Sequence, residues 1–289
     1  MNKIILEKNL KYIGIVAKNP KKCLKFVKYF ESLGYEILFL EKTINKFENL
    51  HKINEEKTLI LSIGGDGTLI STCREIAKNG FKNLNVLGVY DGTLGFLTDI
   101  KIDKLNEFFA DFLKGKYEIK KPLMLEISLK NSKDEIKLIA FNDLVLSRSA
   151  VLSMSKVDAY LDDEYFNTYY GDGVIVSSPV GSTAYNMSAN GPIIYPMSKV
   201  FCITPICAHS LTQRPLVLPA EYKLKFKNAG NSKVSIIIDG QNAFDMSKFD
   251  EVVVRLGDTH ANLIRHLNAN YFEVLKNKLH WGHNGGKVW

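Results

Sequence analysis

The first 120 or so residues alternate short apolar segments with amphipathic ones. The pattern predicts strands at residues 12–17, 36–39, 58–63 and 84–90, and helices at 20–33, 68–78 and 105–113. A glycine closely follows each predicted helix, which is a common way for a helix to end. Alternating strands and helices predict a parallel sheet that is covered by helices on both faces.

After Pro122 the pattern changes to an alternation of apolar and polar residues with period two, which is typical of half-buried strands. Strands are predicted at 123–129, 135–141, 157–161, 173–177, 201–205, 222–226, 233–238 and 251–256. Residues 271–279 are predicted as a helix that could return to the first domain. We therefore expect an α/β N-terminal domain with a parallel sheet plus a mostly antiparallel β-sandwich C-terminal domain. The first would span 1–120, joined by the C-terminal helix at about 269–289, and the second 121–268.

Composition and charge favour a soluble enzyme that binds small anionic ligands. Of the 289 residues, 46% are hydrophobic and 24% charged, and the net charge is +7. Because Lys and Arg are scattered, with short clusters only at 18–28 and 114–121, a nucleic-acid partner is not expected. Residues 1–11 lack a secretory apolar region and no later run is long enough for a membrane span, so we expect a cytoplasmic enzyme without a membrane partner.

An acidic glycine loop, Gly64-Gly65-Asp66-Gly67-Thr68, directly follows the strand predicted at 58–63. Ligands of parallel sheets bind at the carboxyl ends of the strands. Glycines let the backbone N–H groups approach phosphate oxygens, and a helix that begins near Thr68 would point its positive end the same way. Asp66 is therefore the leading catalytic candidate, and Gly64, Gly65, Gly67 and Thr68 are candidate phosphate-binding residues. The alternative is an ordinary capped strand-to-helix turn.

Three further polar segments could lie near this loop. A second glycine loop at 91–99 follows the strand 84–90 and should lie on the same edge of the sheet. Asn142 and Asp143 follow another strand, and the segment 171–186 combines an aspartate between glycines with a Gly-Ser-Thr turn. Its hydroxyls and N–H groups suit ribose or phosphate, although a capped helix behind a buried strand is the alternative. The chain has no GxxxxGK[ST] motif, which excludes a P-loop enzyme.

Taken together, these segments resemble those of the bacterial NAD kinases. The matching pieces are residues 64–68, 94–99, 141–143, 172–173, 178–185, 191–193 and 214–217, and the segment 271–281 is similar to the last helix of that family. Lipid kinases and phosphofructokinases share a similar glycine loop, whereas its combination with Ser-Pro-x-Gly-Ser-Thr-Ala-Tyr is specific. The resemblance implies transfer of a phosphoryl group from ATP or polyphosphate to the 2′-hydroxyl of the adenosine ribose of NAD, giving NADP.

The resemblance also implies roles for single residues. Asp66 would be the general base for the ribose hydroxyl. Mg²⁺ would be held mainly by the donor phosphates and water, without a metal site built from protein ligands. The substrate-binding residues implied in this way are Gly67, Asn142, Asp143, Asp172, Thr183, Ala184, Tyr185, Asn186, Ser188 and Gln241. A homodimer or homotetramer is implied as well.

Three positions depart from the family pattern. Glutamate is usual at Asp143, threonine or serine is common at Val180, and a basic residue is common at Tyr170. The departure at Asp143 affects recognition of the ribose, the one at Val180 removes a hydroxyl contact, and the one at Tyr170 affects recognition of phosphate or adenine. Two other functions stay open at this point. One is a lipid kinase, for which no exposed apolar surface is evident, and the other is a dinucleotide-binding regulator, against which the intact loop around Asp66 argues.

Overall fold

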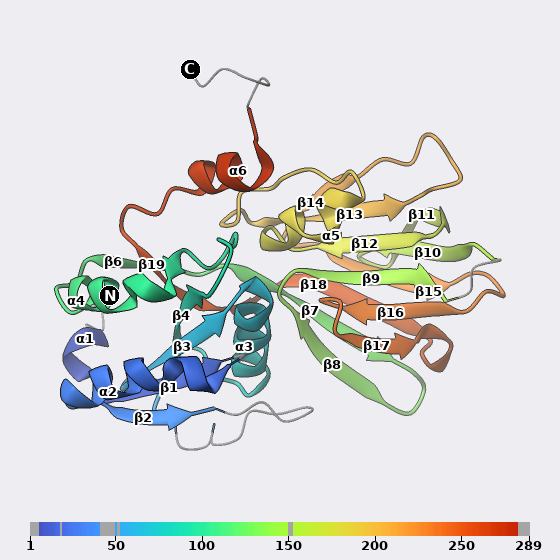
Figure 1. Cartoon of the computed structure of the whole chain (residues 1–289). Coiled ribbons are helices and arrows are strands. Elements are labelled where there is room, and N and C mark those ends of the chain that lie inside the picture. Colours follow the sequence, from blue (N-terminus) through green and yellow to red (C-terminus); the bar gives the residue numbers. More distant parts are fainter. Residues whose placement is uncertain (1–5, 18, 41–49, 51–52, 150–152, 283–289) are drawn as a thin grey trace. The chain divides into compact units, whose positions relative to one another are not determined.

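The computed structural model describes residues 6–17, 19–40, 50, 53–149 and 153–282, and the chain forms two compact units (Figure 1). Unit 1 consists of Met1–Lys121 and Ala261–Trp289, and unit 2 of Pro122–His260. Unit 1 is thus assembled from two stretches of chain that are separated in sequence by the whole of unit 2.

A mostly parallel sheet forms the centre of unit 1. Its strands are β1 (Tyr12–Ala17), β2 (Glu36–Phe39), β3 (Thr58–Gly64), β4 (Asn85–Tyr90), β5 (Ile100–Lys101), β6 (Tyr117–Lys120) and β19 (Asn262–His266). The order is β2-β1-β3-β4-β19-β6, and β5 pairs with β4 off this path. All the pairings are parallel except that of β6 with β19. The expected parallel sheet is confirmed.

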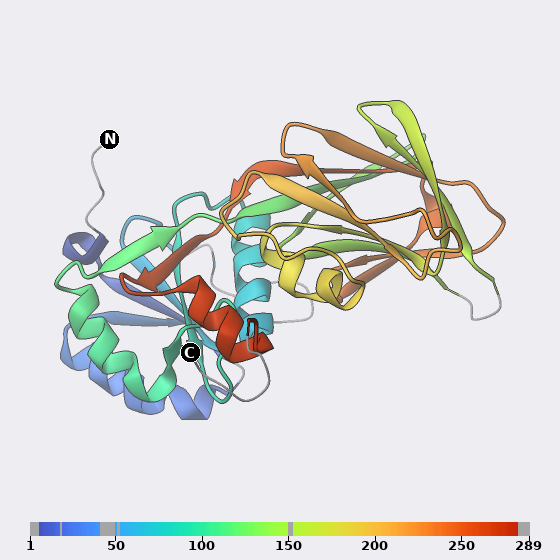
Figure 2. The ribbon, with the colours of Figure 1, turned by 90° about the horizontal axis from the view of Figure 1, so that it is seen from above.

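Helices cover both faces of this sheet. They are α1 (Leu6–Asn9), η1 (Pro20–Cys23), α2 (Leu24–Ser32), α3 (Asp66–Lys78), η3 (Ile102–Lys104), α4 (Leu105–Phe112) and α6 (Tyr271–Leu279). Helices α2 and α4 lie side by side, and their Phe30 and Phe109 rings are 4.8 Å apart between centroids (Figure 2). Both rings belong to a core that includes Leu59 and Leu61 of β3. Because side chains alternate along a strand, Ser62 points to the other face, where it hydrogen-bonds Thr72 of α3.

The position of β19 differs from the expectation, because the expected domain boundary placed residues 261–268 in the β domain. Asn262–Ile264 pair with Asn85–Leu87 of β4, and residues 263–266 pair with β6. The apolar part of this strand is too short to show a period, and its place in a sheet depends on partners far away in the sequence. β19 therefore belongs to unit 1.

Unit 2 contains two antiparallel sheets of six strands each. The first has the order β11-β10-β15-β18-β7-β8, with bounds Glu164–Gly171, Ser155–Leu161, Lys223–Asn228, Glu251–His260, Leu123–Lys130 and Glu135–Ala140. The second has the order β14-β13-β12-β9-β16-β17, with bounds Leu216–Pro219, Val200–Ile206, Gly173–Ser177, Asp143–Arg148, Val234–Ile238 and Asn242–Asp245. Phe226 of the first sheet and Phe201 of the second share one buried core, so the predicted sandwich is confirmed.

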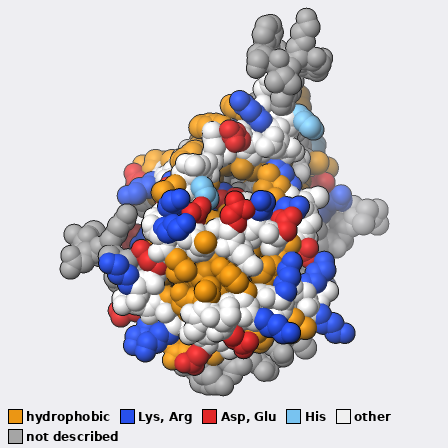
Figure 3. Space-filling view, turned by 60° about the vertical axis from the view of Figure 1, so that its left-hand side comes forward, with side chains coloured by type: hydrophobic (Ala, Val, Ile, Leu, Met, Phe, Trp, Pro, Cys, Tyr) orange, Lys and Arg blue, Asp and Glu red, His pale blue; other side chains and the backbone are white. Residues whose placement is uncertain are grey.

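Short helical turns connect the strands of unit 2, namely η4 (Val180–Thr183), α5 (Tyr185–Ser188) and η5 (Met246–Lys248). In the part of the chain that the structure describes, no helix is long and apolar enough to cross a membrane. On the face shown in Figure 3, Lys and Arg side chains are interspersed with Asp and Glu and do not form one basic stripe.

Candidate active-site elements

The acidic glycine loop lies at the carboxyl end of β3, and α3 begins at Asp66, slightly earlier than the predicted start near Thr68. Gly65 is the N-cap in an extended conformation, with φ −117° and ψ −171°, and its carbonyl accepts from the N–H groups of Thr68 and Leu69 at 3.0 and 3.2 Å. Asp66 thus occupies the first turn of the helix, where the aligned peptide dipoles favour a negative charge.

The second glycine loop holds the carboxylate of Asp66. Its Oδ2 accepts a hydrogen bond from the Phe96 N–H at 2.7 Å. Its Oδ1 accepts from the N–H groups of Leu97 and Thr98, both at 3.1 Å, and from Thr98 Oγ1 at 3.0 Å. Each carboxylate oxygen has about two lone-pair positions, so the three donors to Oδ1 leave no room there for another, whereas Oδ2 has one donor. Among the described residues, only Phe96 donates to Oδ2, so this is the oxygen with a position left for a substrate hydroxyl.

Gly95 allows this close approach of the two loops. A Cβ atom at this position would overlap Asp66 Oδ1 and Thr98 Oγ1. Any larger residue would therefore displace either the loop or the carboxylate.

Arg265 of β19 hydrogen-bonds the second glycine loop and was not among the residues predicted from the sequence. Its Nε donates to Asp99 Oδ2 at 2.9 Å, and its Nη1 donates to the Leu97 carbonyl at 2.9 Å. The Arg265 and Asp99 side chains are each 14% exposed. Burial raises the pKa of Asp99, and the positive charge of Arg265 opposes that rise. The two residues are 166 positions apart, so no local pattern could have revealed the pair.

In unit 2 the structure joins the Asn142–Asp143 pair to the segment that follows β12. The Ser178 N–H donates to the Asn142 carbonyl at 2.8 Å, and Ser178 Oγ donates to the Phe141 carbonyl at 2.6 Å. A Cβ atom at Gly181 would overlap the Asn142 backbone, so glycine is required for this packing. Two of the polar segments singled out in the sequence are therefore one structural cluster.

Asp239 organises this cluster and was also missed. Its carboxylate accepts from the N–H groups of Phe141, Asn142 and Asp143 at 2.9, 2.7 and 3.0 Å. The Asp143 side chain lies nearby, and the residue is only 4% exposed. Burial, together with the negative charge of Asp239, raises the pKa of Asp143 to about 7. Asp239 lies two residues before Gln241, a substrate-binding residue that the family resemblance implies, but its own role depends on contacts with residues far away in the sequence.

The other predicted substrate-binding residues of unit 2 differ in exposure. Tyr185, Ser188 and Gln241 are exposed, and Thr183 and Ala184 are half-buried. Asp172 forms an ion pair with Arg148, with 2.8 Å between Oδ1 and Nε. These residues present polar or aromatic surface that a ligand can reach.

Asn186 is different because its residue is fully buried. Its Nδ2 donates to the carbonyls of Ser182 and Pro192 at 3.2 and 3.1 Å, and its Oδ1 accepts from Thr204 Oγ1 at 2.6 Å. The amide therefore holds the turn together from inside the unit.

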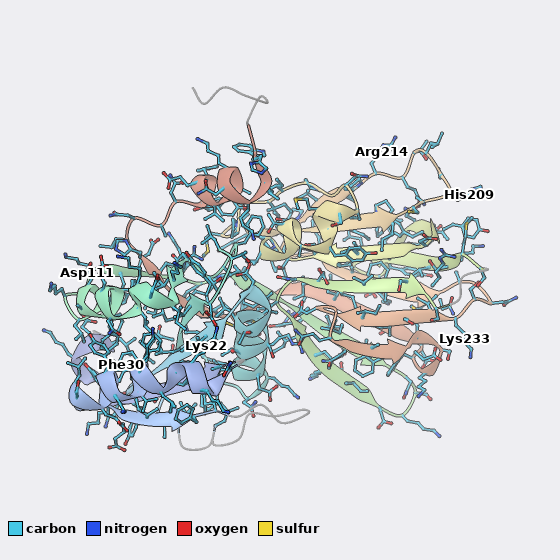
Figure 4. All side chains as sticks on the ribbon, viewed as in Figure 1. Lys22, Phe30, Asp111, His209, Arg214 and Lys233 are labelled. Atoms are coloured by element: carbon cyan, nitrogen blue, oxygen red, sulfur yellow. The ribbon has the colours of Figure 1, made fainter. Side chains whose placement is uncertain are left out.

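The remaining departures from the family pattern also have clear environments. Val180 is buried, with 6% of its surface exposed. Tyr170 is exposed, and its ring centroid lies 5.3 Å from that of His209, which is labelled in Figure 4. A histidine thus lies beside the position where the family commonly has a basic residue.

A carboxylate held on a glycine loop at the carboxyl end of a parallel strand, in a chain that also has a β-sandwich with a polar turn, fits a phosphotransferase of the kinase class. Among the described residues, no three His, Cys, Asp or Glu side chains are grouped so that they could hold a metal ion.

Comparison with known proteins identifies the family. The ATP-NAD kinase N-terminal domain matches residues 14–117, and the ATP-NAD kinase C-terminal domain matches residues 141–266. The NAD kinase of Sulfurimonas denitrificans is 40% identical over 284 residues, which cover 95% of this chain and 99% of that protein. An NAD kinase of Campylobacter jejuni is 40% identical over 287 residues, covering 95% and 97%. The chain belongs to the NAD kinase family and is an enzyme, as predicted.

Solved structures share the fold. Yeast NADH kinase in complex with NADH has a TM-score of 0.81 at 24% identity, and the match covers 97% of this chain and 90% of the yeast chain. An NAD kinase from Archaeoglobus fulgidus in complex with ATP has a TM-score of 0.72 at 22% identity, covering 93% and 98%.

Proposed function

We propose that this enzyme transfers the terminal phosphoryl group of ATP to the 2′-hydroxyl of the adenosine ribose of NAD, giving NADP, and that Asp66 is the general base. The observation that carries this proposal is the hydrogen bonding of the Asp66 carboxylate. It is fixed by four hydrogen bonds from the second glycine loop, and its Oδ2 keeps one position for a further donor.

The chemistry needs such a group. A ribose hydroxyl is too weak an acid to ionise at neutral pH, so a carboxylate within hydrogen-bond reach must take its proton as the bond to phosphorus forms. Phosphoryl transfer has a loose transition state, so the remaining catalysis is alignment and charge neutralisation. The N–H groups of Asp66 and Gly67, which precede the first residues of α3 that donate to the Gly65 carbonyl, suit the second task.

Residues of unit 2 are proposed to bind NAD. The backbone of the Asn142–Asp143 pair is fixed by Asp239, so the half-buried Asn142 side chain can be presented to the ribose with little loss of entropy, and the buried Asp143 is proposed to support that contact. The exposed ring of Tyr185 suits contact with an aromatic base, and Asp172, Thr183, Ala184, Ser188 and Gln241 complete the proposed set. We assign Asn186 to positioning of this turn because its amide is already engaged.

Mg²⁺ prefers hard oxygen ligands, and the proposed site and its substrates offer such ligands. Mg²⁺ in such sites is bound by one or two carboxylates, by substrate phosphates and by water. Asp91 follows β4 and provides one partly exposed carboxylate next to the glycine loop. When bound, Mg²⁺ would supply positive charge that offsets the negative charge of the donor phosphates. From the family resemblance alone, we also propose a cytoplasmic homodimer or homotetramer, which sedimentation analysis of the purified enzyme would test.

The test is to incubate the purified protein with NAD, ATP and Mg²⁺ and to measure NADP with an NADP-specific dehydrogenase. Asp66→Asn should still bind NAD but should lose at least about 10²-fold in turnover. Asp103→Asn is the matched control, because this carboxylate of unit 1 is exposed and forms an ion pair with Lys101. A wild-type protein that binds NAD without forming NADP would instead support the non-catalytic regulator, and wild-type turnover in Asp66→Asn would remove the general base from Asp66.

A further inference from the structure

Thr204 lies on β13, on the outer face of the second sheet of unit 2. Phe201 and Ile203 of the same strand point into the core of the sandwich. Because side chains alternate along a strand, Cys202 and Thr204 point to the opposite face. Both residues are nevertheless fully buried. They are covered by the segment 179–194, whose helix α5 lies beside β12 and reaches β13 through a hydrogen bond to Thr204 (Figure 1).

Asn186 of α5 forms this hydrogen bond, and the chemistry of the two side chains decides which of them donates. The Asn186 Nδ2 donates to the Ser182 and Pro192 carbonyls at 3.2 and 3.1 Å. Its Oδ1 is a carbonyl oxygen and can only accept, so the Thr204 hydroxyl donates its single hydrogen to it at 2.6 Å. The Thr204 oxygen then accepts from the Cys202 thiol at 3.3 Å. Every hydrogen bond of this buried chain therefore has a defined direction.

The Asn186 amide ties together both ends of the turn above it. Ser182 stands before the stretch 183–190, Pro192 stands after it, and the Gly191 N–H donates to the Asn186 carbonyl at 2.8 Å. A Cβ atom at Gly191 would overlap the Asn186 amide, so there is no spare room around it. A rotation of this amide would therefore move the residues of the turn that are proposed to bind NAD, namely Thr183, Ala184, Tyr185 and Ser188.

We propose that Thr204 is a positioning residue for NAD, which acts through Asn186 and not on the substrate itself. Its hydroxyl holds the Asn186 amide, and the amide holds the turn in the conformation that binds NAD. The inference rests on the proposed function and adds to it a buried residue that sets the affinity for NAD. Without the hydroxyl, Asn186 Oδ1 would be a buried acceptor without this partner, so the amide would turn toward another donor and the turn would move with it.

The test compares two substitutions of the same side chain. Thr204→Val keeps nearly the size and shape of threonine and removes the hydroxyl, whereas Thr204→Ser keeps the hydroxyl. Calorimetry of the whole protein with NAD should show binding at least about tenfold weaker in Thr204→Val and within about threefold of the wild type in Thr204→Ser. In the NADP assay, the KM for NAD should rise by a similar factor in Thr204→Val, and the KM for ATP should stay within about twofold.

Two further variants separate this effect from a loss of stability. Thr58→Val is the matched control, since Thr58 is an equally buried threonine whose Oγ1 has no hydrogen-bond partner among the described residues, and it should leave NAD binding unchanged. Gly191→Ala pushes the Asn186 amide aside without altering Thr204. It should weaken NAD binding with the same selectivity, and it decides the question if Thr204→Val does not fold.

A merely structural role of Thr204 would reduce the fraction of active enzyme. In that case kcat would fall in Thr204→Val, while its affinity for NAD would equal that of Thr204→Ser. That result, or wild-type affinity for NAD in Gly191→Ala, would overturn the inference even if the enzyme forms NADP. A wild type that binds NAD and forms no NADP would overturn the proposed function, and the calorimetry would still decide the role of Thr204.

Discussion

Arg265→Met should destabilise unit 1 and slow catalysis without touching the reacting groups. The substitution keeps the apolar stem of the side chain but removes both hydrogen bonds, to Asp99 Oδ2 and to the Leu97 carbonyl. Asp99 then keeps a buried carboxylate whose Oδ1 already has no partner among the described residues. The loop that holds Asp66 loses its support from β19.

The magnitude follows from the burial of the pair. Removing one partner of a buried ion pair typically costs about 3–5 kcal/mol, and with each side chain 14% exposed we expect about 3 kcal/mol at pH 8. In the folded variant, the positive charge of Arg265, the largest influence that opposes the rise in the pKa of Asp99 caused by burial, is absent, so that pKa rises further. A raised pKa means that the folded state holds a proton which the unfolded chain releases, so this destabilisation grows as the pH rises above the usual range of an aspartate.

The assay is urea unfolding followed by circular dichroism at pH 5 and pH 8, for wild type, Arg265→Met and Arg265→Met with Asp99→Asn. The double variant removes both charges and should recover most of the lost stability. Turnover of the single variant should fall about tenfold or more with little change in the KM for NAD, because the base is displaced while NAD binding is kept. A cost below about 1 kcal/mol at pH 8, or no recovery in the double variant, would refute the reasoning.

Two further predictions concern the glycine loop and the buried carboxylate of unit 2. Gly95→Ala should reduce turnover about 10²-fold and keep NAD binding, because the new Cβ displaces Asp66; equal turnover in the NADP assay would contradict this. Asp143→Asn should become more stable relative to wild type as the pH rises from about 4 to 8, by up to about 4 kcal/mol, since the pKa of Asp143 is raised to about 7. Urea unfolding at both ends of this range measures the difference, and a constant difference would show that Asp143 does not titrate in this way.

Much of the fold could be predicted because local patterns of apolar and polar residues determine many of its strands and helices. The strands β1, β2 and β12 and the helix α6 have the predicted bounds, since each is a distinct apolar or amphipathic run with a glycine, proline or polar boundary. The strand β11 was missed because its tyrosines are amphipathic and obscure the alternation of apolar and polar residues. β19 was missed because its place is set by pairing with distant strands.

The candidate site divides in the same way. The glycine loop and the Asn142–Asp143 pair are contiguous in sequence, so residue type and spacing were enough to single them out. Asp239 acts through hydrogen bonds to residues up to 98 positions away, and such contacts leave no local signal. The two-residue difference in the start of α3 has a similar cause, because either Gly65 or Thr68 is an acceptable N-cap and the hydrogen bonds of Asp66 to the second loop decide between them.

The position of β19 between β4 and β6 has a consequence for biosynthesis. While the sandwich is being synthesised, β4 and β6 have unpaired backbone edges, because β19 follows the whole sandwich in the chain. A nascent chain released early, or a fragment cut after His260, would keep those edges exposed and be prone to self-association. Expression of residues 1–260 alone should therefore give aggregates, and expression of the chain with residues 261–289 should give a soluble protein that does not aggregate.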